Sequence, residues 1–166
     1  MSVNIALLTV TDTRTLETDK SGNILVEKIN KAKHNLIDRK ICKDNKEDIK
    51  IILKEWTQKK DLDVIITTGG TGLTGRDITP EALDEIADKH IPGFGEIFRY
   101  FSLETVGTSS IQSRACAILS NGKYIFALPG SSGGVTDAWD KILVHQLDIN
   151  HKPCNFVELF PRLKEK

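Results

Sequence analysis

Residues 63–81, DVIITTGGTGLTGRDITPE, combine the signals of a buried strand, a glycine-rich loop and a helix start in direct succession. Asp63–Thr67 is an almost continuous apolar run rich in β-branched residues, which is typical of a strand covered on both faces in a parallel sheet. Residues 79–81 (TPE) then predict a helix start, with a capping hydroxyl, a proline at the first position and an acid in the first turn. A strand that leads through a loop into a helix indicates an α/β fold.

The chain before this stretch has the same order of strand and helix. Asn4–Val10 and Asn35–Ile41 are predicted strands. Residues 21–22 (SG) are expected to cap a first helix, and residues 44–47 (DNKE) resemble a capping box with Asp44 at the N-cap. The apolar residues that recur at helical spacing are Leu25, Ile29 and Ala32 in the first helix and Ile49, Ile52, Leu53 and Trp56 in the second.

The chain after the glycine-rich loop predicts a helix, a hairpin and a last helix. The helix follows the break at residues 91–93 (IPG), and its regularly spaced residues are Phe94, Phe98, Phe101 and Thr105. Arg114–Leu119 and Tyr124–Leu128 are strands joined around Asn121-Gly122, a strong hairpin signal. The last helix runs from about residue 134 to residue 147. We therefore predict one domain over residues 1–166: a three-layer α/β/α sandwich whose mostly parallel sheet has an antiparallel edge strand.

Ligands of such sheets bind beyond the carboxyl ends of the strands. This rule brings together the loops 11–21, 43–47 and 68–81, and segment 128–132 should join them from the last strand.

Composition limits the kinds of partner that bulk charge can attract. The chain has 166 residues, with 23 Lys and Arg against 23 Asp and Glu, so net charge favours neither nucleic acid nor an anionic membrane. The three cysteines and four histidines are scattered, which argues against a disulfide framework and against a His/Cys metal cluster. The N-terminus lacks the pattern of a signal peptide, and no apolar run approaches the roughly 20 residues of a membrane span. A cytoplasmic protein is expected.

The glycine-rich loop has the composition of an anion site. Gly69, Gly70 and Gly72 allow a tight turn that presents backbone N–H groups to phosphate or carboxylate. The side chains of Thr68, Thr71, Thr74 and Arg76 add donors. Asp77 would repel phosphate unless a cation lies between them, and Mg²⁺ held by carboxylates and phosphate oxygens resolves that conflict. The loop therefore suggests metal-assisted phosphoryl or nucleotidyl chemistry.

Structural interpretations compete with this one. The loop matches the dinucleotide fingerprint literally but follows the third strand and lacks the acid at the end of the next strand, and it has no Lys-Ser/Thr of a Walker A loop. The glycines could simply make a tight connection, with Asp77 pairing with Arg76 or capping the helix. Asp44 and Ser21 could be plain N-caps. Arg99 and Arg114 are expected to be solvated or ion-paired rather than catalytic.

The string TTGGTGLTGRDITPEAL (residues 67–83) resembles the signature of the MoaB/MogA family of molybdenum cofactor biosynthesis proteins, which gephyrin and the plant Cnx G domains share. The likeness continues through residues 8–12 (LTVTD), 19–22 (DKSG), 92–96 (PGFGE), 98–99 (FR), 107–109 (GTS), 112–114 (QSR) and 128–131 (LPGS). These segments cover nearly the whole chain in the family's order. The short length, the PGS of residues 129–131 and the PCNF of residues 153–156 are most similar to the MoaB branch.

The resemblance implies a molybdopterin-binding fold. Active members transfer AMP from ATP to the terminal phosphate of molybdopterin with Mg²⁺ and release pyrophosphate. It also implies that Asp77 and Asp44 are the catalytic, metal-linked acids. The implied binding residues are Ser21, Gly22, Thr68, Gly69, Gly70, Thr71, Gly72, Pro129, Gly130 and Ser131. The chain departs from MogA-type members at residues 132–134 (SGG), where those have proline followed by a basic or small residue.

Three functions follow as hypotheses. The first is adenylyl transfer to molybdopterin, in which the nucleophile is a substrate phosphate. The second is a molybdopterin-binding or accessory protein without turnover, and the third is a scaffold that docks a partner peptide. The face formed by Phe94, Phe98 and Phe101 is wider than one small sheet needs, so it is predicted to help form an oligomer contact. A homo-oligomer, either a trimer or a hexamer, is expected. Trp56 and Trp139 belong to the core or to a subunit interface.

Overall fold

The fold is built around one six-stranded sheet with the strand order β2-β1-β3-β6-β5-β4, in a computed structural model that describes residues 1–165. The strands are β1 (Asn4–Val10), β2 (Asn35–Cys42), β3 (Val64–Thr68), β4 (Lys89–His90), β5 (Cys116–Ser120) and β6 (Lys123–Leu128). β2, β1, β3 and β6 are parallel, whereas β5 is antiparallel to both β6 and β4. The predicted mostly parallel sheet with an antiparallel edge is confirmed, and the two-residue strand β4, which the sequence did not indicate, lies outside β5.

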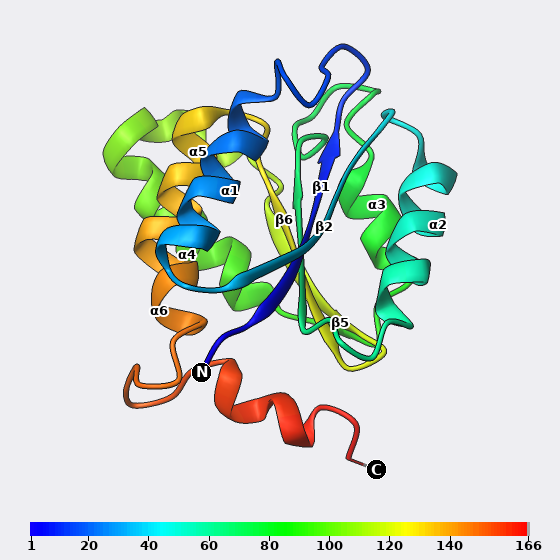
Figure 1. Cartoon of the computed structure of the whole chain (residues 1–166). Helices are drawn as coiled ribbons and strands as arrows, with labels where there is room; N and C mark the ends of the chain where they lie inside the picture. Colours follow the sequence, from blue (N-terminus) through cyan, green and yellow to red (C-terminus); the bar gives the residue numbers. More distant parts are fainter. Residues whose placement is uncertain (166) are drawn as a thin grey trace.

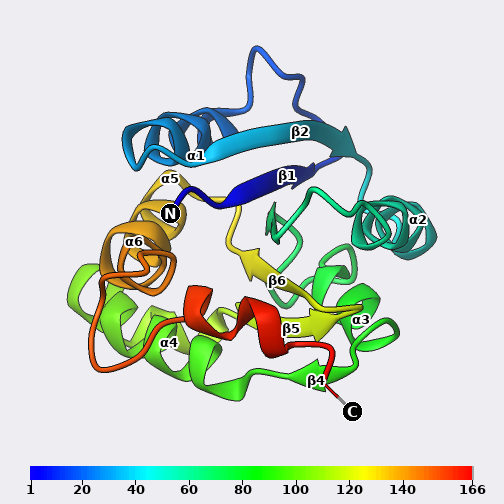
Figure 2. The same ribbon diagram turned by 60° about the horizontal axis from the view of Figure 1, so that its bottom comes forward.

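Helices cover both faces of the sheet (Figures 1 and 2). One layer contains α1 (Lys20–Lys31), α4 (Pro92–Val106), α5 (Ser132–Ala138) and α6 (Val144–Gln146), and the other contains α2 (Lys46–Thr57) and α3 (Thr79–Asp84). Short 3₁₀ helices η1 (Gly107–Gln112) and η3 (Val157–Arg162) and the π-helical segment η2 (Trp139–Leu143) complete the structure. None of the helices in the described part of the chain has the length and apolar character that crossing a bilayer requires.

Each face of the sheet has its own apolar core, which explains why β3 reads as a continuous hydrophobic run. Ile66 packs with residues of α1, α4 and α5, and its neighbour Ile65 packs with residues of α2 and α3. All five residues of β3 are buried. The strand is therefore covered on both faces, as predicted. Trp56 and Trp139 are both core residues, at 0% and 2% exposure.

The N-caps of α1 and α2 differ by one or two residues from those predicted. Asp19, not Ser21-Gly22, caps α1, because its carboxylate accepts a hydrogen bond from the backbone N–H of Gly22. Asn45, not Asp44, caps α2, because its side-chain oxygen accepts from the backbone N–H groups of Glu47 and Asp48 at 3.0 and 3.1 Å. The Asp44 side chain is therefore not used by the helix.

The start of α3 also differs from the prediction that the Thr79 hydroxyl caps the helix. Ile78 is the residue before the helix, and Thr79 is already helical. The Thr79 hydroxyl donates to the carbonyl of Gly69 at 2.9 Å, so it fastens the glycine-rich loop and caps nothing.

The hairpin between β5 and β6 is confirmed. Asn121 and Gly122 have φ values of +47° and +71°, the two positive angles that a two-residue hairpin turn of this hand requires. β5 begins at Cys116, two residues later than predicted, because the backbone N–H of Arg114 donates to Thr71 at 2.9 Å and so binds the glycine-rich loop.

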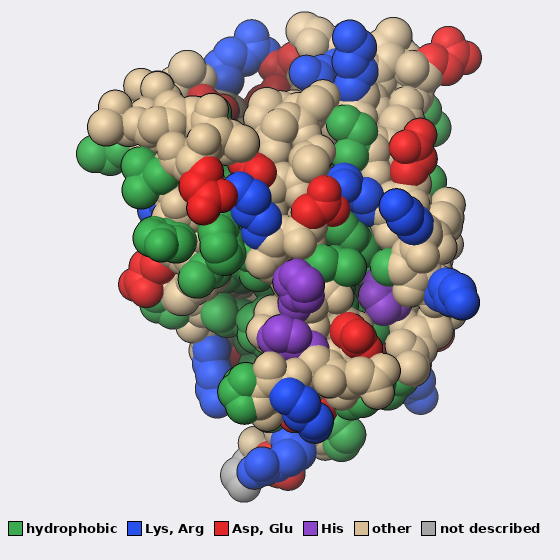
Figure 3. Space-filling view, turned by 90° about the vertical axis from the view of Figure 1, so that its left-hand side faces the viewer, with side chains coloured by type: hydrophobic (Ala, Val, Ile, Leu, Met, Phe, Trp, Pro, Cys, Tyr) green, Lys and Arg blue, Asp and Glu red, His purple; other side chains and the backbone are tan. Residues whose placement is uncertain are grey.

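The prediction that the phenylalanine face of α4 forms an oligomer contact is wrong. Phe94 and Phe98 are 3% and 1% exposed and pack in the core of their own chain, with the Phe94 ring centroid 5.1 Å from that of Phe126. Phe101 is partly buried against the same core. The exposed apolar residues of α4 are Ile97, Tyr100, Leu103 and Val106. Figure 3 shows green hydrophobic side chains on this side of the molecule. A homo-oligomer stays a prediction, but the face of Phe94, Phe98 and Phe101 no longer supports it.

Candidate functional site

A cavity of about 460 Å³ opens beyond the carboxyl ends of the parallel strands, among the loops that converge at the top of Figure 1. Its volume is in the usual range for a small-molecule site. The loops after β1, β2, β3 and β6 meet here, as the sequence led us to expect. The lining residues are Thr9, Val10, Thr11, Thr13, Arg14, Ser21, Asp44, Thr68, Gly69, Gly70, Thr71, Gly72, Asp77, Gln112, Ser113, Pro129, Gly130 and Ser131.

The glycine-rich loop adopts a backbone that only glycine fits. Gly69 and Gly70 have φ values of +102° and +68°, where an L side chain is strained. A Cβ at Gly69 would collide with the Val10 carbonyl oxygen, and one at Gly70 would collide with the Thr79 hydroxyl. A Cβ at Gly72 would lie 2.7 Å from Oδ2 of Asp77. The three glycines therefore allow the Val10 carbonyl, the Thr79 hydroxyl and the Asp77 carboxylate to lie directly against the backbone of the loop.

The loop after β6 is tied to the same bend. The backbone N–H of Gly69 donates to Leu128 at 3.0 Å, and the Thr68 hydroxyl donates to the Pro129 carbonyl at 2.8 Å. The Thr68 hydroxyl is thus a structural donor. Ser131 caps α5 by accepting from the backbone N–H of Gly134 at 3.1 Å. Residues 132–134 (SGG), where the chain differs from the MogA-type pattern, include a glycine that this packing requires. A Cβ at Gly134 would lie 2.9 Å from both Ser131 Oγ and Pro129 Cβ.

Arg114 holds the far side of the glycine-rich loop. Its Nε donates to the Gly72 carbonyl at 2.7 Å, and its Nη2 donates to the Asp77 carbonyl at 2.8 Å. The same guanidinium forms an ion pair with Glu81. These contacts confirm that Arg114 is ion-paired, and they show that it fixes the segment that carries Asp77.

Asp77 neither pairs with Arg76 nor caps a helix. Its carboxylate accepts from the Thr74 backbone N–H at 2.8 Å and from the Thr74 hydroxyl at 2.7 Å. Burial disfavours the charged form, but these bonds and one from the Gly72 amide outweigh it and hold the pKa of Asp77 below its ordinary value. Asp77 is therefore ionised at neutral pH. Arg76 forms an ion pair with Asp12, is 74% exposed and does not line the cavity.

Asp44 faces the cavity from the loop before α2. Its backbone N–H donates to Asp12 Oδ1 at 3.1 Å, and its carboxylate lines the cavity. An ideal Cβ on Gly70 would lie 3.5 Å from Asp44 Oδ1, so Asp44 and Asp77 both lie against the backbone of residues 70–72. Partial burial and then the negative charge of Asp77 raise the pKa of Asp44 above its ordinary value. Two carboxylates that repel each other in this way favour a cation near them.

This donor set fits Mg²⁺ better than a structural metal. Within residues 1–165 there is no group of three or more His, Cys, Asp or Glu side chains that could enclose an ion. Mg²⁺ commonly uses one or two carboxylates and takes its other ligands from water and substrate phosphates. Asp44 and Asp77 supply such a pair, and the remaining ligands would come from a substrate.

Ser21 and Gly22 have different positions. Ser21 lines the cavity and donates to Asp19 at 3.3 Å. Gly22 does not line the cavity: its amide donates to Asp19 at 2.9 Å, and a Cβ there would collide with that carboxylate. The other implied binding residues, from Thr68 through Gly72 and from Pro129 through Ser131, all line the cavity. Their roles in binding stay predictions.

The sequence reasoning missed Arg14, Thr13, Gln112 and Ser113 as lining residues. Arg14 Nη1 donates to the Gly130 carbonyl at 3.2 Å in the loop after β6 and to Ser21 Oγ at 3.4 Å in the first turn of α1. The loop that carries Arg14 was expected at the site, but a loop has no periodicity that shows which side chains point inward.

An open α/β sheet with a glycine-lined cavity beyond its carboxyl ends is the arrangement typical of proteins with a nucleotide-binding type of α/β fold. Residues 6–149 match the family described as "Probable molybdopterin binding domain". The chain is 44% identical to molybdenum cofactor biosynthesis protein B of Escherichia coli K12 over 161 residues, 97% of this chain and 93% of that protein.

Solved structures give the same result. A crystal structure of molybdenum cofactor biosynthesis protein B has a TM-score of 0.89 and 40% identity, covering 100% of this chain and 98% of that one. The tungsten cofactor synthesizing protein MoaB from Pyrococcus furiosus has a TM-score of 0.76 and 35% identity, covering 86% and 91%. The chain belongs to the MoaB/MogA family, and the resemblance found in the sequence is confirmed.

Proposed function

We propose that this protein acts in molybdenum cofactor biosynthesis by binding molybdopterin and transferring AMP from Mg-ATP to its terminal phosphate. Family membership supports the pathway and the pterin. The observation that carries the reaction is the placement of Asp44 and Asp77 against the backbone of residues 70–72, where partial burial and then the charge of Asp77 raise the pKa of Asp44. A carboxylate pair beside a glycine-rich bend that lines the cavity suits a nucleotide bound with a divalent ion.

The nucleophile in this proposal belongs to the substrate. An oxygen of the molybdopterin phosphate forms a bond to the α-phosphorus of ATP while the bond from that phosphorus to the β-phosphate oxygen breaks, and pyrophosphate leaves. No described residue that lines the cavity is a histidine or cysteine, which agrees with a reaction that needs no protein nucleophile. The chain then contributes positioning and charge neutralisation.

The residues divide these tasks. The Gly70 amide would donate to a phosphate oxygen, whereas the Gly72 amide already binds Asp77, and Asp44 and Asp77 would hold Mg²⁺. That ion would offset the phosphate charge that the two carboxylates otherwise repel. Arg114 and Thr74 keep Asp77 in place from outside the cavity.

The test is to incubate the protein with molybdopterin and Mg-ATP and to measure adenylylated molybdopterin and pyrophosphate. Asp77→Asn should lower turnover on the order of 10³-fold, the loss typical of one electrostatic group, while molybdopterin binding survives. The matched control is Asp84→Asn, an exposed aspartate of α3 that pairs with His90 outside the cavity. Wild-type turnover in Asp77→Asn excludes the metal role. A wild-type protein that binds molybdopterin without releasing pyrophosphate is the non-catalytic binding protein instead.

A further inference from the structure

The charges that line the cavity are separated into two sides. Arg14, Asp44 and Asp77 are the charged residues among the described lining residues, and Arg14 is the one cation. Arg14 contacts Ser21 of α1 and Gly130 just before α5, whereas Asp44 and Asp77 precede α2 and α3. α1 and α5 cover one face of the sheet, and α2 and α3 cover the other (Figure 1). The cavity is therefore positive on the α1/α5 side and negative on the α2/α3 side.

The charge of Arg14 is available to a ligand. In residues 1–165, no carboxylate lies within ion-pair distance of Arg14, whereas Arg39, Arg76 and Arg114 each have one. The hydrogen bonds that Arg14 makes to Ser21 and Gly130 both use Nη1. Nε and Nη2 therefore remain as donors, in the fork geometry that suits two oxygens of one phosphate.

A chain of hydrogen bonds holds Arg14 in this position. Arg39 forms an ion pair with Asp19 at 3.0 Å, and Asp19 accepts from the Ser21 hydroxyl at 3.3 Å. Because Ser21 donates its proton to Asp19, its oxygen is free to accept from Arg14 at 3.4 Å. Asp19 is fully buried, so the chain is anchored in the protein interior.

We propose that Arg14, with Ser21 and the loop of Gly130 and Ser131, forms a phosphate subsite that works without a metal ion, separate from the Asp44/Asp77 side, which accepts phosphate only through a divalent cation. This deepens the proposed function, on which it rests for the identity of the two phosphates: the molybdopterin phosphate binds at Arg14, and the ATP phosphates bind at the acids. Opposite polarity on the two sides allows both anions in one cavity and fixes which side each takes.

The test uses inorganic phosphate as the probe, with EDTA present, followed through the backbone amide NMR signals. In the wild type, the signals of Ser21, Gly130 and Ser131 should move most, and the titration gives the affinity. Arg14→Gln should weaken binding about 10-fold or more, because a charge-assisted contact is lost. Arg14→Lys should fall between, since it keeps the charge without the fork. Asp77→Asn should bind phosphate equally well or better, because a repelling charge is removed.

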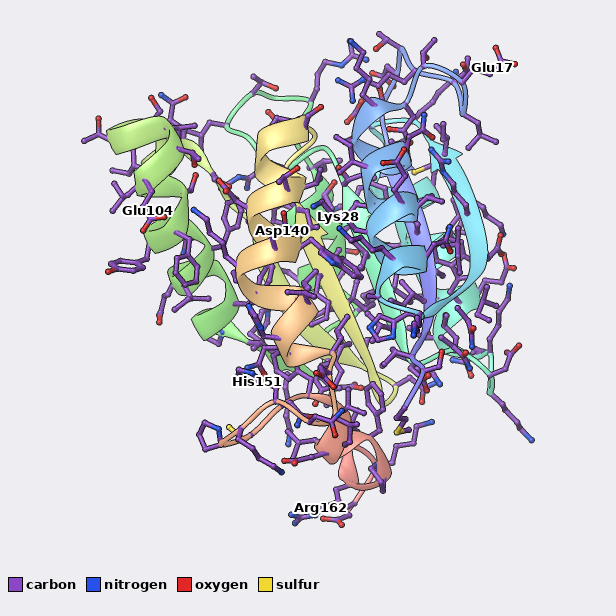
Figure 4. The ribbon with its side chains drawn as sticks, turned by 60° about the vertical axis from the view of Figure 1, so that its left-hand side comes forward. Glu17, Lys28, Glu104, Asp140, His151 and Arg162 are labelled. Atoms are coloured by element: carbon purple, nitrogen blue, oxygen red, sulfur yellow. The ribbon has the colours of Figure 1, made fainter. Side chains whose placement is uncertain are left out.

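Arg162→Gln is the control for loss of one positive charge. Arg162 is exposed and pairs with Glu165, and Figure 4 shows it at the opposite end of the molecule from Glu17, which lies in the loop of Arg14. The proposal is overturned if wild type shows no metal-free binding, if Arg14→Gln binds as wild type does, or if phosphate moves only the signals of Gly70 and Gly72.

Enzyme kinetics separate this inference from the proposed function. Arg14→Gln should raise KM for molybdopterin about 10-fold and leave KM for ATP within about 2-fold. If the protein transfers AMP and Arg14→Gln leaves KM for molybdopterin unchanged, the phosphate subsite is overturned and the proposed reaction stands. Arg14-dependent phosphate binding in a protein without adenylyl transfer overturns the reaction alone.

Discussion

At the scale of single residues, Asp44 and Asp77 have opposite pKa shifts although they share one cavity. Asp77 is held ionised by donors from its own loop, and its charge then acts on Asp44. We expect Asp77→Asn to lower the pKa of Asp44 toward its ordinary value, with burial keeping part of the shift. Addition of Mg²⁺ to the wild type should also lower it, since a cation favours the charged form.

The measurement is a carbon-13 NMR titration of the Asp44 carboxyl group in wild type, Asp77→Asn and the control Asp84→Asn. An unchanged pKa in Asp77→Asn would mean that the two carboxylates do not interact, and the joint cation site would lose its basis. The readout needs no turnover, so it applies to an enzyme and to a binding protein alike.

At the scale of secondary-structure elements, two neighbouring residues at the start of α2 have different roles. Asn45 caps the helix, and Asp44 lines the cavity. Asn45→Ala should lower the free energy of unfolding by about 1 kcal/mol, the usual value of an N-cap, and leave adenylyl transfer intact. Asp44→Asn should leave stability within about 0.5 kcal/mol of wild type and reduce transfer. Urea unfolding and the adenylylation assay, both run on both variants, check this crossed pattern. Equal loss of stability in Asp44→Asn would make Asp44 a structural residue.

The elements show what the sequence could predict and what it could not. Apolar periodicity located β1, β2, β3, the hairpin and the main helices, because burial imposes it on the residues themselves. The helix caps were less accessible, since residues 19–22 (DKSG) and 44–45 (DN) each offer several capping side chains in a row. Long-range contacts make the choice: the Asp44 backbone N–H binds Asp12, and the Thr79 hydroxyl binds Gly69.

At the scale of the whole molecule, the sequence identified the edge of the sheet that carries the cavity, since the carboxyl ends of parallel strands meet there. It did not identify Arg14, whose place depends on contacts with Ser21 at the start of α1 and with Gly130, which is far away in the sequence. The sequence also led to the wrong role for Phe94 and Phe98. Helical spacing shows that these side chains share one face of the helix, but it does not show whether that face packs on the sheet of its own chain or on another subunit. Phe94 packs on Phe126 of β6, and Phe98 belongs to the same apolar core, so both are buried within their own chain.

Asp19 connects three elements of the molecule and makes the whole fold sensitive to acid. Its buried carboxylate accepts from the Thr9 hydroxyl of β1 at 2.6 Å, from the Gly22 amide of α1 and from Arg39 of β2. Burial opposes the charge, but these contacts prevail and lower the pKa of Asp19 below its ordinary value of 3.8. The stability that Asp19 contributes is therefore present above about pH 4 and lost as the pH falls through the lowered pKa.

Asp19→Asn should lower the free energy of unfolding by about 3 kcal/mol at pH 7, because Arg39 loses its partner. In urea unfolding series the difference from wild type should keep its full size at pH 5 and shrink at pH 4 and pH 3, as the carboxylate becomes protonated first in the unfolded chain and then in the folded one. Asp140→Asn is the comparison: Asp140 is 52% exposed and faces Lys28 at 2.6 Å (Figure 4), so its loss should cost about 1 kcal/mol or less. A difference between Asp19→Asn and wild type that stays constant from pH 7 to pH 3 would show that the ionised carboxylate is not what joins β1, α1 and β2.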